Sequence, residues 1–343
     1  MFAKFSPDGK YVAYVRDSHI HVENLGDQAI RTLTTSDNSM IFNGRFDWVY
    51  EEELGIRDGF RWSPDGSAIA YWQFDETGVR RQTLVDNVSA LYPKVTRFGY
   101  PKVGQQNASC RIGVVEVETA ETTWIKVPGD PRENYLARME WAGPKNSDQL
   151  VIQQLNRAQN KKLVMIAERR GGAVTTVLTE KDSTWVVVNN DLNWTPDGKS
   201  FTWTSERDGW EQLFRISQDG TKTTKLTTDN FDIDLLHVDT SGLWAYFLAS
   251  PQNPAHRYLY RVGLDGEGLR RLTPESERRG THSYRISPSG DFAVWTRSDA
   301  DTPSITRLVS LPDHAVIKTL EGNLELHAKI RALNPVSYTH LTL

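Results

Sequence analysis

The first copy of a recurring motif reads Phe5-Ser6-Pro7-Asp8-Gly9-Lys10-Tyr11-Val12-Ala13-Tyr14. An aromatic residue precedes a Ser/Thr-Pro-Asp-Gly turn, in which Pro restricts φ and Gly accepts a positive φ. Alternating apolar residues then begin a strand. Clear copies occupy 62–71 and 194–203, a weaker copy occupies 286–295, and degenerate copies start at Trp141 and Val238.

The spacing of these copies indicates the fold. The six starts are separated by 57, 79, 53, 44 and 48 residues. Most of these gaps are close to the roughly 40–50 residues of a four-stranded propeller blade. Further Asp-Gly hairpin signals, at Asp219-Gly220 and Asp265-Gly266, place a second hairpin in the repeat. The sequence therefore predicts an all-β protein, a β-propeller of four-stranded antiparallel blades with about six blades present.

The longest gap contains an excursion from Gln82 to Cys110. It carries two Tyr-Pro-Lys copies, at Tyr92 and Tyr100. Proline cannot donate to a β-ladder, so we expect an extended arm docked on the propeller and not a core strand.

The two ends of the chain depart from the repeat. No strand signal precedes Phe5, so we expect the first blade, and with it the propeller, to be incomplete at the N-terminus. Asn323–Leu333 has the pattern of a short helix or linker. The partial propeller is expected to span residues 1–334, and residues 335–343 match nothing earlier, as expected of a non-native tail.

Composition excludes several classes of function. The formal net charge is −4 and no Lys/Arg cluster is present, which argues against nucleic-acid binding. No apolar run is long enough to cross a bilayer. Cys110 is the only cysteine, so an intramolecular disulfide and a thiolate metal cage are both excluded. No metal site and no cofactor are expected.

Charge is concentrated in Asp47-Trp48-Val49-Tyr50-Glu51-Glu52-Glu53-Leu54. On an outer surface this segment would be a solvated acidic patch. If the segment faced a cavity, its negative charge would need a cation to balance it. The 57-residue interval that contains it exceeds the other short gaps, so we expect an insertion between the first two blades and not part of a blade.

Several motifs occur in the order found in one peptidase family. They are Asp47–Glu53, Trp62–Gly66, Ala70–Phe74, Tyr92–Lys94 and Tyr100–Gly104. On these residues the chain, up to about Asn334, resembles the N-terminal β-propeller of dipeptidyl peptidase IV-like enzymes in the prolyl oligopeptidase family of serine peptidases, with a bacterial origin favoured. The Ser-Pro-Asp-Gly turns are shared by many propellers, whereas the acidic string with the paired Tyr-Pro-Lys motifs is specific.

The resemblance implies an eight-bladed propeller that admits substrate to a C-terminal α/β-hydrolase domain carrying Ser, Asp and His. The full enzyme would release Xaa-Pro or Xaa-Ala dipeptides from peptide amino termini. Glu52 and Glu53 would bind the substrate α-ammonium group, with Asp47, Trp48, Tyr50 and Glu51 in supporting roles. Members of the family usually dimerise, which implies a homodimer formed through the arm Gln82–Cys110.

The sequence also departs from the family. It contains no Gly-x-Ser-x-Gly nucleophile elbow, so no catalytic residue is assigned and the chain is expected to be inactive alone. The hydrolase domain and the family's cavity arginine are missing. His19 and His21 are interpreted as solvent-facing strand residues and not metal ligands, and His282 as a residue that packs a blade.

Two other functions stay open at this point. One is a non-catalytic propeller that acts as an interaction scaffold. The other is the propeller of an endopeptidase or acyl-aminoacyl peptidase relative, which has no need of paired carboxylates for a free ammonium group. A periplasmic or cell-envelope location is favoured over the cytoplasm, although no signal segment is present.

Overall fold

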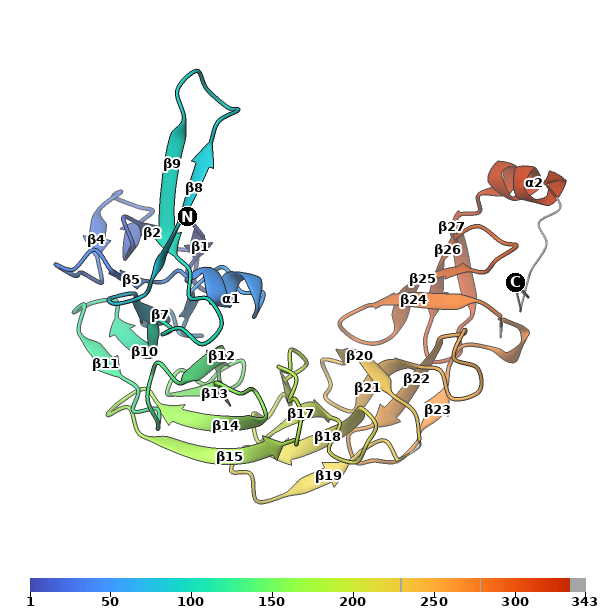
Figure 1. Cartoon of the computed structure of the whole chain (residues 1–343). Coiled ribbons are helices and arrows are strands. Elements are labelled where there is room, and N and C mark those ends of the chain that lie inside the picture. Colours follow the sequence, from blue (N-terminus) through green and yellow to red (C-terminus); the bar gives the residue numbers. More distant parts are fainter. Residues whose placement is uncertain (229, 278, 334–343) are drawn as a thin grey trace. The chain divides into compact units, whose positions relative to one another are not determined.

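The structure is a computed structural model that describes residues 1–228, 230–277 and 279–333. The suggested tail, residues 335–343, lies outside the described residues. The chain divides into two compact units, Met1–Val188 and the residues from Asn189 onward. In the described residues, six antiparallel sheets follow one another along the chain, together with one separate hairpin (Figure 1). The all-β prediction is confirmed, and the six sheets are called blades 1 to 6.

Unit 1 contains blades 1 to 3. Blades 1 and 3 are simple meanders in which each strand pairs with the next. The strands of blade 1 are β1 (Lys4–Phe5), β2 (Tyr11–Arg16), β3 (His19–Asn24) and β4 (Ile30–Thr32); those of blade 3 are β12 (Asn134–Trp141), β13 (Gln149–Asn156), β14 (Lys161–Glu168) and β15 (Val174–Lys181). The expectation that blade 1 would lack a strand is wrong, because the short β1 pairs with β2.

Blade 2 has an interrupted first strand. Its strands are β5 (Ile41–Asn43), β6 (Phe60–Trp62), β7 (Ala68–Asp75), β10 (Ser109–Glu116) and β11 (Thr122–Trp124). Both β5 and β6 pair with β7, β5 opposite residues 73–75 and β6 opposite residues 69–71. Together they act as one edge strand that is broken by an excursion.

Unit 2 contains blades 4 to 6, all four-stranded meanders. Their strands are β16 (Asn193–Trp194), β17 (Ser200–Ser205), β18 (Gln212–Ser217), β19 (Thr223–Lys225), β20 (Ile233–Val238), β21 (Trp244–Ala249), β22 (Tyr258–Gly263), β23 (Arg270–Arg271), β24 (Thr281–Ile286), β25 (Phe292–Ser298), β26 (Ile305–Ser310) and β27 (Val316–Glu321). A 3-10 turn, η1 (Glu275–Glu277), precedes β24, and α2 (Leu324–Ala332) forms where a short helix or linker was expected.

The recurring turn has the same hydrogen bonds in its clear copies. In the first copy the Ser6 hydroxyl donates to Asp8 Oδ1 at 2.7 Å and accepts from the Tyr11 N–H at 3.0 Å. Gly9 has φ +70°, which a residue with a Cβ rarely adopts. Ser63 and Thr195 bind the Asp of their own copies at 2.6 Å. The motif is therefore a self-contained turn that joins the first two strands of a blade.

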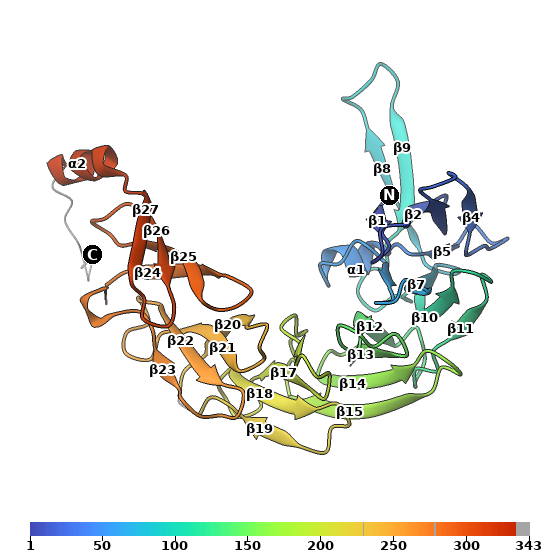
Figure 2. The ribbon, with the colours of Figure 1, turned by 180° about the vertical axis from the view of Figure 1, so that it is seen from behind.

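The arm is a two-stranded ribbon, β8 (Arg81–Asp86) and β9 (Lys94–Gly99), which pairs with no blade. It projects from blade 2 in both views (Figures 1 and 2). Most of its side chains are exposed, and Cys110 is a buried residue of β10. The extended arm is therefore confirmed, as a ribbon over residues 81–99 instead of Gln82–Cys110. The expectation that the arm is docked on the propeller is wrong, because the ribbon stands off blade 2 along most of its length.

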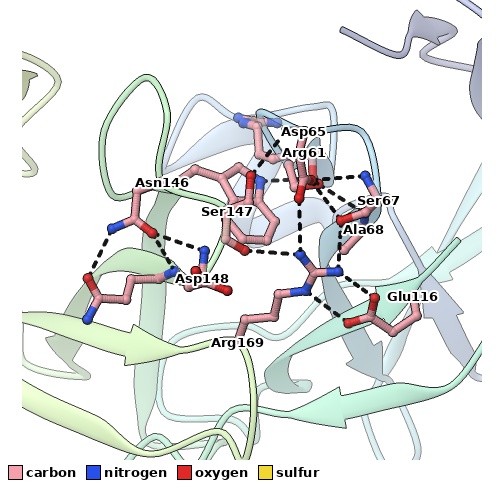
Figure 3. Close-up of polar contacts among 12 residues, drawn as sticks. Arg61, Asp65, Ser67, Ala68, Glu116, Asn146, Ser147, Asp148 and Arg169 are labelled. Carbon is pink, nitrogen blue, oxygen red and sulfur yellow. Dashed lines mark hydrogen bonds and ion pairs between the residues drawn. The ribbon is translucent and has the colours of Figure 1, made fainter. Parts of the chain in front are cut away.

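Blades 2 and 3 are joined by apolar faces and by ion pairs, one of which is made by a buried arginine. Trp72, Met139 and Ile152 belong to a single buried cluster of blades 2 and 3. Arg169, in the turn after β14, is 5% exposed and donates to Glu116 Oε1 of blade 2 at 2.9 Å (Figure 3). It also donates to the Ser67 hydroxyl at 2.9 Å. This arginine ties blade 3 to the recurring turn of blade 2.

Candidate functional site

The acidic segment lies in the excursion that interrupts the first strand of blade 2. Residues 44–59 leave the blade between β5 and β6, and a bridge between Arg45 and Asp58 closes the base. The Gly59 N–H donates to the Gly44 carbonyl at 3.0 Å. The predicted insertion is confirmed. Its predicted place between two blades is wrong, because both flanking strands belong to blade 2.

The base of the insertion requires glycine. A Cβ added to Gly59 would lie 2.5 Å from the Gly44 carbonyl carbon and 2.7 Å from the Arg45 nitrogen. Both are backbone atoms and cannot rotate away. Gly59 therefore allows the two ends of the excursion to cross closely enough for blade 2 to continue beyond it.

Asp47 caps the short helix α1 (Trp48–Glu52) that carries the acidic residues. Its backbone is extended and its Oδ1 accepts from the Tyr50 N–H at 3.0 Å, as an N-cap residue does. Burial raises the pKa of Asp47 to about 7, and the negative charges of Glu76 and Glu51 add to this. Asp47 is thus a structural support for α1, with its carboxyl group turned away from water.

Tyr50 anchors α1 to blade 3. Its ring is buried and packs against Phe74 with the centroids 4.8 Å apart. Its hydroxyl oxygen accepts from the Leu136 N–H of β12 at 2.8 Å. Burial raises the pKa of Tyr50, so the hydroxyl stays neutral. A phenol is suited to this place because it fills an apolar space and also satisfies a buried backbone donor.

Trp48 connects α1 to the base of the arm. Its half-buried ring lies 4.3 Å, centroid to centroid, from the ring of Tyr100, which directly follows β9. The Tyr100 ring in turn contacts Phe98 of β9. Tyr100 begins the second Tyr-Pro-Lys motif, so the structure brings two parts of the sequence pattern together.

The three glutamates differ in their surroundings. Glu51 is half-buried, whereas Glu52 and Glu53 are exposed. Within the part of the chain that the structure describes, the carboxylates of Glu52 and Glu53 have no hydrogen-bond or ion-pair partner. Two adjacent free carboxylates on an anchored segment are therefore available to a cation.

Arg45 is a basic residue close to the acidic residues around α1. Burial lowers the pKa of Arg45, and the negative charges of Glu76, Glu51 and Asp47 oppose that effect. The guanidinium of Arg45 lies 3.8 Å from the centroid of the Phe42 ring and donates to the Ser18 hydroxyl. Its interactions are thus made within the fold, and it does not ion-pair with Glu52 or Glu53.

The sequence of residues 1–304 matches the family model described as the dipeptidyl peptidase IV N-terminal region. The chain belongs to the dipeptidyl peptidase IV N-terminal region family. It is 28% identical over 345 residues to dipeptidyl peptidase 4 of Arthroderma otae, covering 96% of this chain and 44% of that protein. Dipeptidyl peptidase 4 of Trichophyton rubrum is 26% identical over 357 residues, covering 100% and 45% of the two chains.

A comparison with solved structures also finds a dipeptidyl peptidase 4. The crystal structure of dipeptidyl peptidase 4 from Porphyromonas gingivalis superimposes with a TM-score of 0.85 at 26% identity, covering 97% of this chain and 46% of that one. The blades described above are therefore those of a dipeptidyl peptidase IV propeller, as the sequence predicted. The chain spans less than half the length of each of these relatives.

The described histidines contribute to no candidate metal site. Among the described residues, no group of three or more His, Cys, Asp and Glu side chains is placed to hold a metal ion. The prediction that His21 faces solvent is wrong: it is buried, and its Nδ1 lies 3.1 Å from the Thr32 hydroxyl. His282 packs inside blade 6, as predicted, stacked on Trp295.

The described helices include none that is long and apolar enough to span a bilayer.

Sequence reasoning missed the groups of blade 3 that hold α1. These are the backbone of Leu136, 86 residues along the chain from Tyr50, and the side chain of Arg138, 84 residues from Leu54. The Leu136 contact is made by a backbone N–H that any residue other than proline could offer, so no residue type marked it. Gly59 carried the only usable signal, a glycine immediately before an aromatic strand.

Proposed function

We propose that this chain is the substrate-recognition propeller of a longer serine-type dipeptidyl peptidase, in which Glu52 and Glu53 bind the α-ammonium group of the substrate. The supporting observation is a pair of exposed carboxylates, on the last residue of α1 and its C-cap, for which the described residues offer no partner, while Asp47 caps the helix and Tyr50 buries its ring. The substrates would be peptides with a free amino terminus, cleaved after a penultimate Pro or Ala.

The chemistry of the pair suits this ligand. An amino terminus is a compact cation with three N–H donors, and each carboxylate can accept a charge-assisted hydrogen bond from it. Held at a set distance from the nucleophile, the pair would measure two residues from the amino terminus to the scissile bond. A longer peptide would leave both carboxylates unpaired in a desolvated site, which is costly. Selectivity would then come from the cost of binding a longer peptide as well as from the attraction of a free amino terminus.

The bond-breaking chemistry would take place in an α/β-hydrolase domain encoded beyond this chain. The chain itself contains no Gly-x-Ser-x-Gly elbow. The propeller would admit and orient the substrate, and alone it would hydrolyse no peptide bond. Measurable Xaa-Pro hydrolysis by purified chain 1–343 would contradict this part of the proposal.

The decisive experiment uses the full-length protein and a chromogenic Xaa-Pro substrate with a free amino group. Glu52→Gln and Glu53→Gln should each lower kcat/KM by about one to two orders of magnitude, because a hydrogen bond to a charged group contributes about 1.5–3 kcal/mol. Glu51→Gln is the matched control and should have a smaller effect. Unchanged kcat/KM in both main variants would refute the role of the pair.

We also propose that the arm forms a homodimer contact. Val88, Leu91 and Tyr92 at its tip are 94%, 90% and 81% exposed, and an apolar cluster of this kind on a projecting ribbon is typical of an interaction surface. The ribbon also has free edges that a second copy could pair with. Replacing residues 87–93 by a short Gly-Ser turn should convert a dimer to a monomer in sedimentation. A dimer of unchanged stability would exclude the arm.

A further inference from the structure

A β-bulge in blade 3 forms the seat of α1. The pairing of β12 with β13 shifts register between Leu136 and Arg138, so Ala137 is the extra residue. Both backbone groups of Leu136 are then bound by blade 2. Its N–H donates to the Tyr50 hydroxyl at 2.8 Å, and its carbonyl accepts from Trp72 Nε1 at 2.9 Å.

Arg138, the next residue of the bulge, holds the other end of the acidic segment. Its Nη2 donates to the Leu54 carbonyl at 3.0 Å, and its Nη1 donates to the Ala137 carbonyl at 2.6 Å. The guanidinium is planar, so these two bonds set its orientation as well as its position. Leu54 is itself buried and directly follows Glu53.

The two exposed glutamates therefore lie between two anchors on one strand. Tyr50 is held by Leu136, and Leu54 is held by Arg138. A helix of five residues does not keep its shape unaided, and its last carbonyls lack partners within the helix. Arg138 binds the Leu54 carbonyl, two residues past the end of α1, so it fixes the chain just beyond the helix, and its positive charge there complements the helix dipole.

We propose that Arg138 is a positioning residue for the ammonium-binding pair, which fixes the backbone from which Glu52 and Glu53 project and so sets the preference for a free amino terminus. This inference rests on the proposed function. Binding sites lose selectivity when their supporting residues allow displacements of about 0.5 Å or more. Without Arg138, the Leu54 end of the segment loses a hydrogen bond, while Tyr50 still holds the other end.

The test compares two inhibitors of the full-length protein. Ala-Pro carries an α-ammonium group, and propionyl-proline is the same molecule without it. The ratio of their inhibition constants measures recognition of the ammonium group alone. Inhibition constants do not depend on how much of a preparation is active, so partial unfolding of a variant leaves the ratio unchanged.

For the wild-type protein we expect Ala-Pro to bind about 10–100-fold more tightly, from the strength of charge-assisted hydrogen bonds. Arg138→Gln should weaken Ala-Pro about tenfold and leave propionyl-proline unchanged, the equivalent of about 1.4 kcal/mol. Arg138→Lys keeps the positive charge and N–H donors but loses the planar fork, so this variant should retain part of the preference for Ala-Pro. Arg132→Gln is the matched control, because Arg132 also donates to carbonyls of unit 1, but to those of Asn107 and Thr77 and not to Leu54.

The outcomes separate the two proposals. A wild-type protein that binds both inhibitors equally would refute the proposed function itself. A wild-type protein that discriminates, with an Arg138→Gln variant that discriminates equally well, would refute the positioning role alone. An equal weakening of both inhibitors by Arg138→Gln would also refute it, because the effect would then not concern the ammonium group.

Discussion

The hydroxyl oxygen of Tyr50 accepts a hydrogen bond from the backbone N–H of Leu136 at a distance of 2.8 Å. This contact joins the acidic helix of blade 2 to the bulge of blade 3, and Arg138 of the same bulge holds Leu54 just beyond the helix. It determines that α1 is held by a neighbouring blade and does not depend only on its own short hydrogen-bonded turn.

Tyr50→Phe should therefore destabilise unit 1. The ring still fills the apolar space, but the buried Leu136 N–H loses its acceptor, which costs about 1–3 kcal/mol. Urea unfolding of the chain measures this change. Tyr135→Phe is the control and should cost less, because Tyr135 is half-buried and its hydroxyl accepts from the Asn107 side chain in a partly buried bond and not from a buried backbone N–H. Equal losses in the two variants would argue against the anchor.

Gly59→Ala tests the crossing at the base of the insertion. The added Cβ would meet backbone atoms at 2.5–2.7 Å, so β5 and β6 could not keep their common alignment on β7. We expect a loss of about 1–3 kcal/mol, as for overpacking elsewhere. Gly26→Ala is a suitable comparison, since the Cβ there would meet only a side-chain oxygen of Asn24, at 3.3 Å. Thermal unfolding that left both variants as stable as wild type would contradict the structure at this point.

Asp47 should make unit 1 less stable as the pH rises. Its pKa is raised by burial to about 7 in the folded chain, against about 3.9 in an unfolded chain. Between these two pKa values the folded state binds a proton that the unfolded state has lost. The resulting contribution to the free energy of unfolding is fully present below pH 4 and is lost as the pH rises towards 7. Asp47→Asn keeps the N-cap acceptor and removes the charge.

The measurement is the difference in unfolding free energy between Asp47→Asn and the wild type across pH 4 to 8. The variant should gain stability relative to the wild type as the pH increases. A difference that does not change with pH would show that Asp47 is not titrating in this range.

His282 should make unit 2 less stable as the pH falls. Burial lowers its pKa to about 4, with the positive charge of Arg297 and the nearby His314 adding to the effect. As the pH falls, the unfolded chain takes up the proton first. The contribution of His282 to the free energy of unfolding is therefore fully present above about pH 6.5 and is lost as the pH falls towards 4. Protonation would also abolish the acceptor role of His282 Nδ1, which receives the Trp295 Nε1–H at 2.9 Å.

His282→Gln should reduce this acid sensitivity, because the amide keeps an acceptor and does not titrate. Tryptophan fluorescence between pH 7 and 4 measures the unfolding. An acid transition that is unchanged in the variant would exclude His282 as its source.

The sequence alone was sufficient for the fold class, the family and the identity of the acidic segment. Each of these depends on local chemistry that is visible in one stretch: a turn that needs Pro, Asp and Gly in order, alternating apolar residues, and a run of carboxylates. The family resemblance implied supporting roles for Asp47 and Tyr50. It could not say what they support, because their partners are not neighbours in the sequence.

Tertiary structure alone decided where the insertion emerges and what holds it. Two short strands, β5 and β6, share β7 as a partner, and this pairing placed the insertion inside blade 2 instead of between blades. The Leu136 N–H and the Leu54 carbonyl are backbone groups, which every non-proline residue carries, so no residue type marks them in advance. Whether two carboxylates form a site depends on such contacts between distant segments, and these contacts exist only once blades 2 and 3 have packed together.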